Sequence, residues 1–181
     1  MKKLIILLFA MILLLTSCSN INNILSNRES EKIKQMSTDI LTCITENDKE
    51  SFKNLFCERS QNIPGFDEQV DAMFEYCNGT VCFTDSTIKT TASGGSSTQK
   101  GERVEWYVNP EIPYFEVLSE PDPDEEQSTY FSVMKSRYYS IRYSWYITYE
   151  SDKAVEGLHG LKIELLNVDS MTVGEWISLF D

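Results

Sequence analysis

The segment from Arg137 to Glu150 (RYYSIRYSWYITYE) limits the fold more strongly than any other part of the chain. Large apolar or aromatic side chains fill its odd positions, which are Tyr139, Ile141, Tyr143, Trp145, Ile147 and Tyr149. This period of two predicts a β-strand with one face on a core and the other in water. At about 3.3 Å per residue the strand runs roughly 40 Å, so it must bend over whatever it packs on. We predict that it is the central strand of an antiparallel sheet.

Helical spacing dominates the chain before this strand. Residues 30–46 carry apolar side chains three or four positions apart, and Asp48 is a fitting N-cap for a second, short helix. A third helix starts at Phe66, after proline and glycine have broken the chain. Helices first and strands afterwards predict an α+β fold, with three N-terminal helices packed on one face of an antiparallel sheet.

Alternation around the central strand predicts its neighbours. We expect one strand to begin at Val81 and further strands to lie at 102–108, 112–118 and 158–166. The Gly-Ser-rich stretch 84–100 is expected to be a flexible hairpin connection, and no GxxxxGK[ST] pattern indicates a phosphate-binding loop there. Asn109-Pro110 is expected to interrupt the sheet, and the tail 169–181 is expected to form a short helix docked on the body.

The N-terminus has the organisation of a bacterial export signal. Lys2 and Lys3 precede an apolar run of about a dozen residues, and Leu-Thr-Ser leads into Cys18. The run is too short to span a membrane. A cysteine after Leu-Thr-Ser resembles the lipobox of bacterial lipoproteins, which implies that the Cys18 thiol is acylated and becomes the mature N-terminus. The alternative is an ordinary signal peptide in which Cys18 has no special role.

We therefore divide the chain into a lipoprotein signal peptide at 1–17, a lipidated tether at 18–29 and a single α+β domain at 30–181. Two acyl chains hold a protein stably on a bilayer, so the predicted location is extracytoplasmic, with a lipid anchor in the cell membrane. The formal net charge of −12 becomes more negative when Lys2 and Lys3 leave with the signal. Such an acidic chain repels polyanions, so we expect no nucleic-acid partner.

Two segments, Glu46 to Gly79 and Tyr139 to Leu165, resemble an uncharacterised domain found in small bacterial lipoproteins. Members of that family pair a DKExLKxLF helix and a DLDEQIxxxFxFxxG helix with a late YxIxxxxYxxN…EGIxxIxI hairpin. The matching residues are Asp48, Lys49, Glu50, Phe52, Leu55, Phe56, Phe66, Asp67, Glu68, Gln69, Phe74 and Gly79 for the helices, and Tyr139, Ile141, Glu156, Gly157, Leu158 and Ile163 for the hairpin. Most of them are core and turn residues, so the resemblance concerns the fold more than an activity.

The resemblance implies the cone-shaped α+β fold of the nuclear-transport-factor and SnoaL-like proteins, which is also called cystatin-like. In that fold three N-terminal helices pack in the curve of a strongly bent antiparallel sheet, and the cone often holds a pocket. Some relatives use the pocket for catalysis and others for binding alone, and the resemblance transfers no activity to this chain. The acidic loop 119–128 and the tail 169–181 depart from the family pattern.

Four cysteines remain after lipidation, and they are Cys43, Cys57, Cys77 and Cys82. An even number outside the membrane permits two disulfides, and Cys77 and Cys82 flank an Asn-Gly turn that could bring them together. The alternative, which we favour, is four small buried side chains in a reduced state. Their spacing lacks the CxxC pairs of a structural zinc site, so we expect no metal and no cofactor.

Aromatic side chains and the only histidine are the candidates for a ligand pocket. Alternation places His159 inward with Leu161 and Ile163, where SnoaL-like enzymes sometimes keep an acid or base. The predicted pocket residues are Trp106, Tyr143, Trp145 and His159. The same aromatics suit an ordinary core, and a lone histidine is more often a hydrogen-bonded structural residue than a catalyst.

The outward face of the central strand offers a second candidate site. Tyr138, Arg142 and Tyr146 form a predicted patch for a protein partner, because Tyr and Arg are favoured at binding hot spots. The acidic loop 119–128 could bind calcium, but it lacks the glycine of an EF-hand loop and contains two prolines. We interpret it as a solvated loop.

These features predict a membrane-anchored, non-catalytic binding module that engages a small ligand or a protein through its cone or its outer sheet face. One alternative is a SnoaL-like enzyme that uses His159 with an inward carboxylate. Another is a structural lipoprotein that associates with itself as a homodimer. A deep polar pocket around His159 would favour the enzyme, whereas a sealed cone with an exposed Tyr/Arg patch would favour a protein partner.

Overall fold

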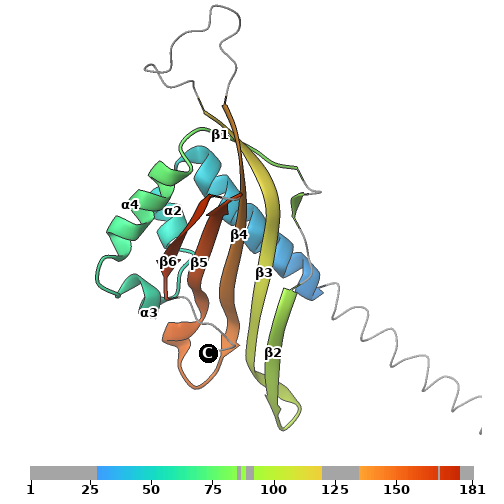
Figure 1. The fold of residues 1–181 in the computed structure, drawn as a ribbon. Coiled ribbons are helices and arrows are strands. Elements are labelled where there is room, and N and C mark those ends of the chain that lie inside the picture. The colour runs from blue at the N-terminus through green and yellow to red at the C-terminus, as the bar shows by residue number, and fades with distance from the viewer. Residues whose placement is uncertain (1–27, 85–86, 89–91, 120–134, 167, 176–181) are drawn as a thin grey trace, which may run out of the picture.

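A computed structural model describes the protein over residues 28–84, 87–88, 92–119, 135–166 and 168–175. Within these ranges the protein is an α+β structure, in which helices accompany a six-stranded antiparallel sheet (Figure 1). The signal peptide, Cys18, and most of the tether and of the acidic loop lie outside the described residues. No helix in the described part of the chain is long and apolar enough to cross a membrane.

The helices follow the expected order, with one addition, the short α3. Their bounds are 28–46 for the N-terminal helix, Lys49–Lys53 for α2, Glu58–Gln61 for α3 and Phe66–Tyr76 for α4. The Asp48 carboxylate caps α2 by accepting a hydrogen bond from the Ser51 amide at 2.9 Å. Gly65 precedes α4 in a left-handed conformation that glycine adopts without strain. The buried face of α4 carries Phe66, Val70, Met73 and Phe74.

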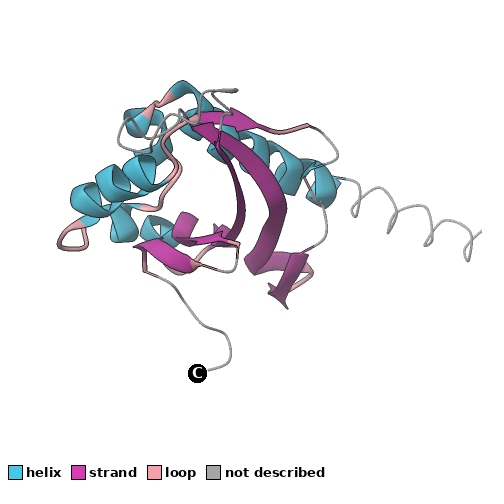
Figure 2. Ribbon diagram, turned by 45° about the horizontal axis from the view of Figure 1, so that its top comes forward, coloured by secondary structure: helices cyan, strands magenta, loops and turns pink. Residues whose placement is uncertain are grey.

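The sheet places the predicted central strand in its middle. The strands are β1 (Thr80–Cys82), β2 (Ala92–Gln99), β3 (Glu102–Ser119), β4 (Lys135–Tyr149), β5 (Gly157–Leu165) and β6 (Asp169–Gly174). Their order is β1-β3-β4-β5-β6, and β2 pairs with β3 on the same side as β1. The N-terminal helix crosses behind β3 and β4 in Figure 1, and Figure 2 shows both strands curving.

Buried side chains from the helices and the strands form a common core. Among its fully buried members are Ile40, Leu41, Phe52, Ile112, Ile141 and Leu161. Tyr143 is also fully buried, and its hydroxyl group lies 2.8 Å from the Ser37 hydroxyl and donates to the Ile33 carbonyl at 3.3 Å. Burial raises the pKa of the Tyr143 phenol. These hydrogen bonds join the N-terminal helix directly to β4.

A bulge near the end of β4 changes which side chains share a face. A register shift between Trp106 and Tyr107 of β3 makes Ile147 an extra residue of β4. Tyr149 therefore lies beside Tyr146, with ring centroids 5.4 Å apart. Simple alternation predicted Tyr149 on the opposite, inward face, and that prediction is wrong because it assumed an unbroken period of two.

A second bulge lies at His159. The register of β5 shifts opposite Ser144 and Trp145, which leaves His159 as the extra residue of β5. Leu158 remains in the core, whereas the His159 ring turns to Tyr146, with 4.9 Å between the ring centroids. His159 is buried, as its inward prediction implied, but the bulge places its ring against Tyr146, which alternation had assigned to the outward face.

The stretch 84–100 contains a strand, which corrects the expectation of a flexible connection. β2 pairs with β3 along its whole length, and this pairing explains the two glycines at its centre. A Cβ atom on Gly94 would lie 2.3 Å from the Tyr107 carbonyl oxygen, and one on Gly95 would lie 2.7 Å from the Tyr107 hydroxyl oxygen. The glycines are therefore required by close packing between two strands, which composition does not reveal.

The expected break at Asn109-Pro110 does not occur. β3 continues through both residues, and the buried Pro110 lies opposite Ala92 of β2. Pairing with β4 is found on either side, at Val108 and Glu111, so the sheet tolerates the missing N–H group of the proline.

The tail begins with a strand and not with the expected helix. Residues 169–174 form β6, which pairs with β5 in the order Leu165 to Asp169 and Gly160 to Gly174. Val173 is fully buried in the core, and alternation toward β5 explains the strand. Residues 176–181 lie outside the described residues.

Candidate functional site

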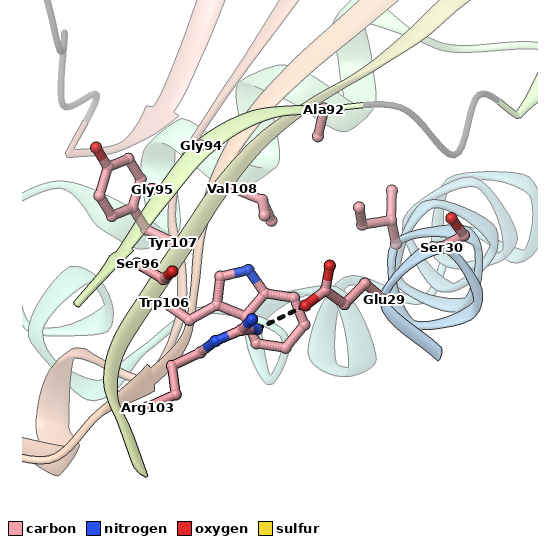
Figure 3. A pocket seen from close by; sticks show the side chains of 11 residues that line it. Glu29, Ser30, Ala92, Gly94, Gly95, Ser96, Arg103, Trp106, Tyr107 and Val108 are labelled. Atoms are coloured by element: carbon pink, nitrogen blue, oxygen red, sulfur yellow. Dashed lines mark hydrogen bonds and ion pairs between the residues drawn. The ribbon is translucent and has the colours of Figure 1, made fainter. Parts of the chain in front are cut away.

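An open cleft lies between the start of the N-terminal helix and the strands β2 and β3 (Figure 3). It has a volume of about 380 Å³, which is within the size range of small-molecule sites. Its walls include Glu29, Ser30, Gly94, Gly95, Arg103 and Trp106. We call it the Trp106 cleft.

Two cations lie over the Trp106 ring. The Lys32 Nζ atom is 5.3 Å from the ring centroid, and the guanidinium carbon of Arg103 is 4.5 Å from it. Both distances permit cation–π attraction, which contributes about 0.5–1 kcal/mol at exposed sites. Arg103 also donates a hydrogen bond of 2.7 Å to the Glu29 carboxylate, which approaches from the helix (Figure 3). The charged residues that line the cleft are therefore Arg103 and Glu29, and Lys32 adds a second cation on the Trp106 ring without lining the cleft.

The register between β2 and β3 shapes one wall of the cleft. Ser96 lies opposite Trp106, and Gly94 lies opposite Val108. Because neither Gly94 nor Gly95 has space for a side chain, this part of the wall is bare backbone. Peptide N–H and C=O groups are therefore exposed next to an aromatic ring and two cations, a combination that suits polar recognition.

A second cavity, of about 270 Å³, surrounds His159, and we call it the His159 cavity. The His159 Nε2 atom lies 2.9 Å from the Val155 carbonyl oxygen, and since a carbonyl group can only accept, Nε2 carries the proton. The Nδ1 atom is buried and has no hydrogen-bond partner among the described residues. The cavity is completed by Arg59, Tyr146, Tyr149 and Asp152.

The Cys57 thiol lies next to this histidine. The backbone amide of Cys57 donates to the Leu158 carbonyl at 2.8 Å, and the Cys57 Sγ atom lies 3.3 Å from the Ser60 hydroxyl. Burial alone raises the pKa of the Cys57 thiol, but contacts with His159 and Ser60 lower the pKa by more, so the net shift is downward. Burial lowers the pKa of His159, but its contacts with Cys57 and Val155 outweigh burial and the net shift is upward. A thiol beside an imidazole can form an activated nucleophile.

Access limits what this pair can do. Cys57 and His159 are each 2% exposed, and the residues that line the His159 cavity do not include Cys57. A substrate would reach the sulfur atom only after the surrounding structure had opened. Within the described ranges, no group of three or more His, Cys, Asp or Glu side chains could hold a metal ion.

The four cysteines among the described residues differ in burial. Cys43, Cys57 and Cys77 are free and buried, whereas Cys82 is free and exposed, which differs from the four buried side chains expected from the sequence. Burial raises the pKa of Cys43 to about 11 and that of Cys77 to about 12. These two thiols are therefore inert side chains of the core.

The four residues predicted to line one pocket lie in three different surroundings. Trp106 lines the Trp106 cleft, and His159 lines the His159 cavity. Tyr143 is sealed in the core by its hydrogen bond to Ser37, and Trp145 packs against the same core. Alternation identified large side chains correctly but gave no information on how deep each one would lie.

The predicted partner patch is also divided. Tyr138 and Arg142 are exposed on the outer face of β4, and Arg142 forms an ion pair of 2.8 Å with Glu164. Tyr146 belongs instead to the His159 cavity. The patch on β4 therefore consists of two of the three predicted residues.

Sequence reasoning missed the charged half of the Trp106 cleft. Arg103 and Glu29 are 74 positions apart in the chain, and Lys32 also comes from the N-terminal helix. The one local signal was an arginine three positions before a tryptophan in an alternating segment. Recognition of the full cluster needs the packing of the helix across the sheet.

Residues 39–112 match the model of a family described as a domain of unknown function (DUF5104). The matched region contains β2, Arg103 and Trp106, whereas Glu29, Lys32 and His159 lie outside it. The match covers less than half of the chain, and the chain matches no curated protein. The comparison agrees with the uncharacterised domain expected from the sequence and assigns no function.

Proposed function

We propose that this chain is a lipid-anchored, extracytoplasmic and non-catalytic binding module whose Trp106 cleft holds an anionic group of the ligand. The observation that carries the proposal is the pair formed by Arg103 and Glu29 beside the Trp106 ring, with 2.7 Å between Nη1 and Oε1. Glu29 indicates which chemistry fits the cleft, because its carboxylate already accepts a hydrogen bond from the Arg103 guanidinium. A carboxylate or phosphate of the ligand would take the place of Glu29.

This exchange costs little free energy. The Arg103 and Glu29 side chains are 38% and 35% exposed, so water screens the pair, and such pairs contribute about 0–1 kcal/mol. A guanidinium binds carboxylate or phosphate through two parallel N–H groups. Lys32 adds a second positive charge on the same indole. The ligand therefore gains a preformed cationic site at the cost of one weak internal contact.

The N-terminal sequence supports the anchor. In this proposal Cys18 carries the lipid, and an extended chain of at most about 40 Å connects it to Glu29. The cleft then lies within reach of the bilayer surface. The curved strands and the helix that crosses them support a SnoaL-like cone as the type of fold (Figure 2).

A binding role fits the structure better than the alternative enzyme. Catalysis at His159 would need a substrate to reach its ring or the Cys57 thiol, and both side chains are 2% exposed. The Trp106 cleft is open, and it contains no cysteine or histidine among its described lining residues. The guanidinium and indole groups of this cleft can bind a ligand without taking part in a reaction.

The test is thermal unfolding of the full chain in detergent, with a panel of small carboxylates, phosphates and neutral sugars. A ligand at about 100 times its Kd stabilises a protein by about 2.7 kcal/mol. For a domain of this size we expect the Tm to rise by roughly 5–10 °C with anionic compounds.

Arg103→Ala should abolish this rise. Lys49→Ala is the matched control, because Lys49 also combines an exposed ion pair, with Asp71 at 2.6 Å, and a position over an aromatic ring, that of Phe74, and it does not line the cleft. Equal rises in Tm for the two variants, or a preference for neutral sugars, would contradict the proposal.

A further inference from the structure

We infer that the ligand of the Trp106 cleft is an extended, acidic segment of a partner protein, which adds a strand to the free edge of β2. The inference rests on the proposed function and names the ligand class for the same site. Three observations carry it, namely an uncovered sheet edge, bare backbone where that edge meets the cleft, and local positive charge.

β2 is paired on one side only within the described part of the sheet. Its partner is β3, and seven of its eight residues are exposed. In Figure 1 it lies at the margin of the sheet. Every second residue of an antiparallel edge strand directs its N–H and C=O groups outward, so β2 offers about four such residues to a further strand.

Within the described residues, this edge carries none of the usual protection against pairing. Edge strands normally carry charged side chains, prolines or bulges that keep other chains away. The β2 sequence ASGGSSTQ contains neither a charge nor a proline. Its register irregularity lies between Ser97 and Thr98, so the pairing from Ala92 to Ser97 is regular. β2 therefore presents a backbone template of about six residues.

The edge and the cleft share the residues Gly94, Gly95 and Ser96. A strand added to β2 would lie about 4.8 Å beyond it and about 10 Å from β3. The long Arg103 side chain on β3 and a glutamate on the added strand together span this distance.

Charge favours an acidic partner over a second copy of this chain. Two copies would each bring a net charge of −12, and the β2 edge of the second copy carries no acid to meet Arg103. Pairing of two β2 edges would also bring two clusters of Arg103 and Lys32 together, which costs free energy. An extended acidic segment would form hydrogen bonds with the β2 backbone and ion pairs with Arg103 and Lys32 at the same time.

The test uses the full chain in detergent and a blocked heptapeptide of alternating valine and glutamate. Two related peptides serve as controls, one with lysine in place of glutamate and one N-methylated at alternate amides. N-methylation removes the hydrogen-bond donors of strand pairing and leaves the charge intact. We expect the glutamate peptide to bind at least about tenfold more tightly than either control, which corresponds to about 1.4 kcal/mol.

Amide hydrogen exchange should localise the peptide, with new protection confined to residues 92–97. Arg103→Ala should weaken binding of the glutamate peptide about tenfold, and Lys49→Ala, which removes an exposed ion pair with Asp71 on the helices, should leave it unchanged. Equal binding of the N-methylated peptide would overturn strand addition, as would a stable dimer of the chain that the peptide does not dissociate. If small carboxylates bind in the cleft and the peptide does not, the inference fails while the proposed function stands.

Discussion

The two margins of the sheet, β6 and β2, are built in opposite ways. At the β6 margin, side chains of α4 occupy the exposed backbone. Gln69 Oε1 accepts a hydrogen bond from the Gly174 amide at 3.0 Å, and the Tyr76 hydroxyl bonds the carbonyl and carboxylate of Asp169. The same hydroxyl accepts from the Leu165 amide at 3.3 Å. At the β2 margin the described residues supply no comparable contact.

The comparison shows that side chains of this protein cover the backbone at one edge of its sheet, that of β6. A glutamine and a tyrosine of α4 bond the backbone at both ends of β6, at Gly174 and Asp169, and so obstruct that edge as a template. On the other side a strand of small side chains is left uncovered beside two cations and an indole. We therefore regard the closed margin as structural and the open margin as the place of interaction.

The largest expected difference between the margins comes from two glycine substitutions. Gly174 has a φ of 78°, and a Cβ atom there would lie 2.3 Å from the His159 carbonyl oxygen. Because α4 and β5 hold Gly174 on two sides, we expect Gly174→Ala to lower the free energy of unfolding by about 3 kcal/mol. A Cβ atom at Gly94 meets the Tyr107 carbonyl at the same distance, but β2 is free to move away, so Gly94→Ala should cost about 1 kcal/mol.

Chemical denaturation of the two variants measures both values. An equal loss of stability in Gly94→Ala and Gly174→Ala would break the comparison. It would show that β2 is held as firmly as β6.

The next effect concerns the hydroxyl that closes the β6 margin. Tyr76→Phe removes a group that bonds exposed Asp169 and half-buried Leu165, and we expect a loss of about 1.5 kcal/mol because these hydrogen bonds disappear. Tyr114→Phe is the matched control, since Tyr114 is 61% exposed, and it should change stability by less than about 0.5 kcal/mol. Faster amide exchange in β6 of Tyr76→Phe would sharpen the comparison, and unchanged exchange there would count against it.

The pH dependence of stability in alkaline solution should differ between a cysteine on the β6 side and a cysteine on the β2 side of the sheet. Cys77 follows α4, and burial raises its pKa from 9.0 to about 12, whereas Cys82 of β1 is exposed. Above pH 9 the unfolded chain loses the Cys77 proton and the folded chain keeps it, so stability falls as the pH rises. By pH 10 the contribution of Cys77 should reach about 1.4 kcal/mol, and the buried Cys43, whose pKa is raised to about 11, should add a loss of similar size.

Urea unfolding of the reduced protein between pH 9 and 10 measures this loss. Cys77→Ala should reduce the loss at pH 10 by about 1.4 kcal/mol, and Cys82→Ala should leave it unchanged. If Cys82→Ala reduced the loss of stability and Cys77→Ala did not, the buried thiol would lie on the β2 side of the sheet, and the comparison would be wrong.

The smallest effect is expected at the open margin. Arg103→Ala should change the free energy of unfolding by no more than about 0.5–1 kcal/mol, because its contacts with Glu29 and Trp106 are exposed to water. The same variant should lose ligand binding. A loss of several kcal/mol in denaturation would reveal a structural role for Arg103 and weaken its assignment to ligand recognition.

The sequence was sufficient for elements with a strong period. β4 was predicted from its alternation, and α2 was predicted from Asp48 and the apolar positions that follow. The α+β class follows from the same reasoning, because burial of apolar side chains determines both periods.

The sequence was insufficient where one residue or one distant contact decides the geometry. Alternation fails at Ile147 and His159 because a bulge inserts a residue without any change in composition. β2 was interpreted as a flexible connection because glycine and serine favour loops, although pairing with β3 holds them extended. The charged half of the Trp106 cleft depends on a helix that begins more than seventy positions earlier in the chain, so no local pattern indicates it.

The most direct measurement is amide hydrogen exchange of the unliganded full chain, resolved to single residues in β2 and β6. We expect alternate amides between Ala92 and Ser97 to exchange as freely as those of an unfolded chain, because they point away from β3. In β6 the amides that face β5 should be protected, and so should the Gly174 amide, which donates to Gln69. Protection of every amide from 92 to 97 would contradict the account, because it would mean that the β2 edge is already covered.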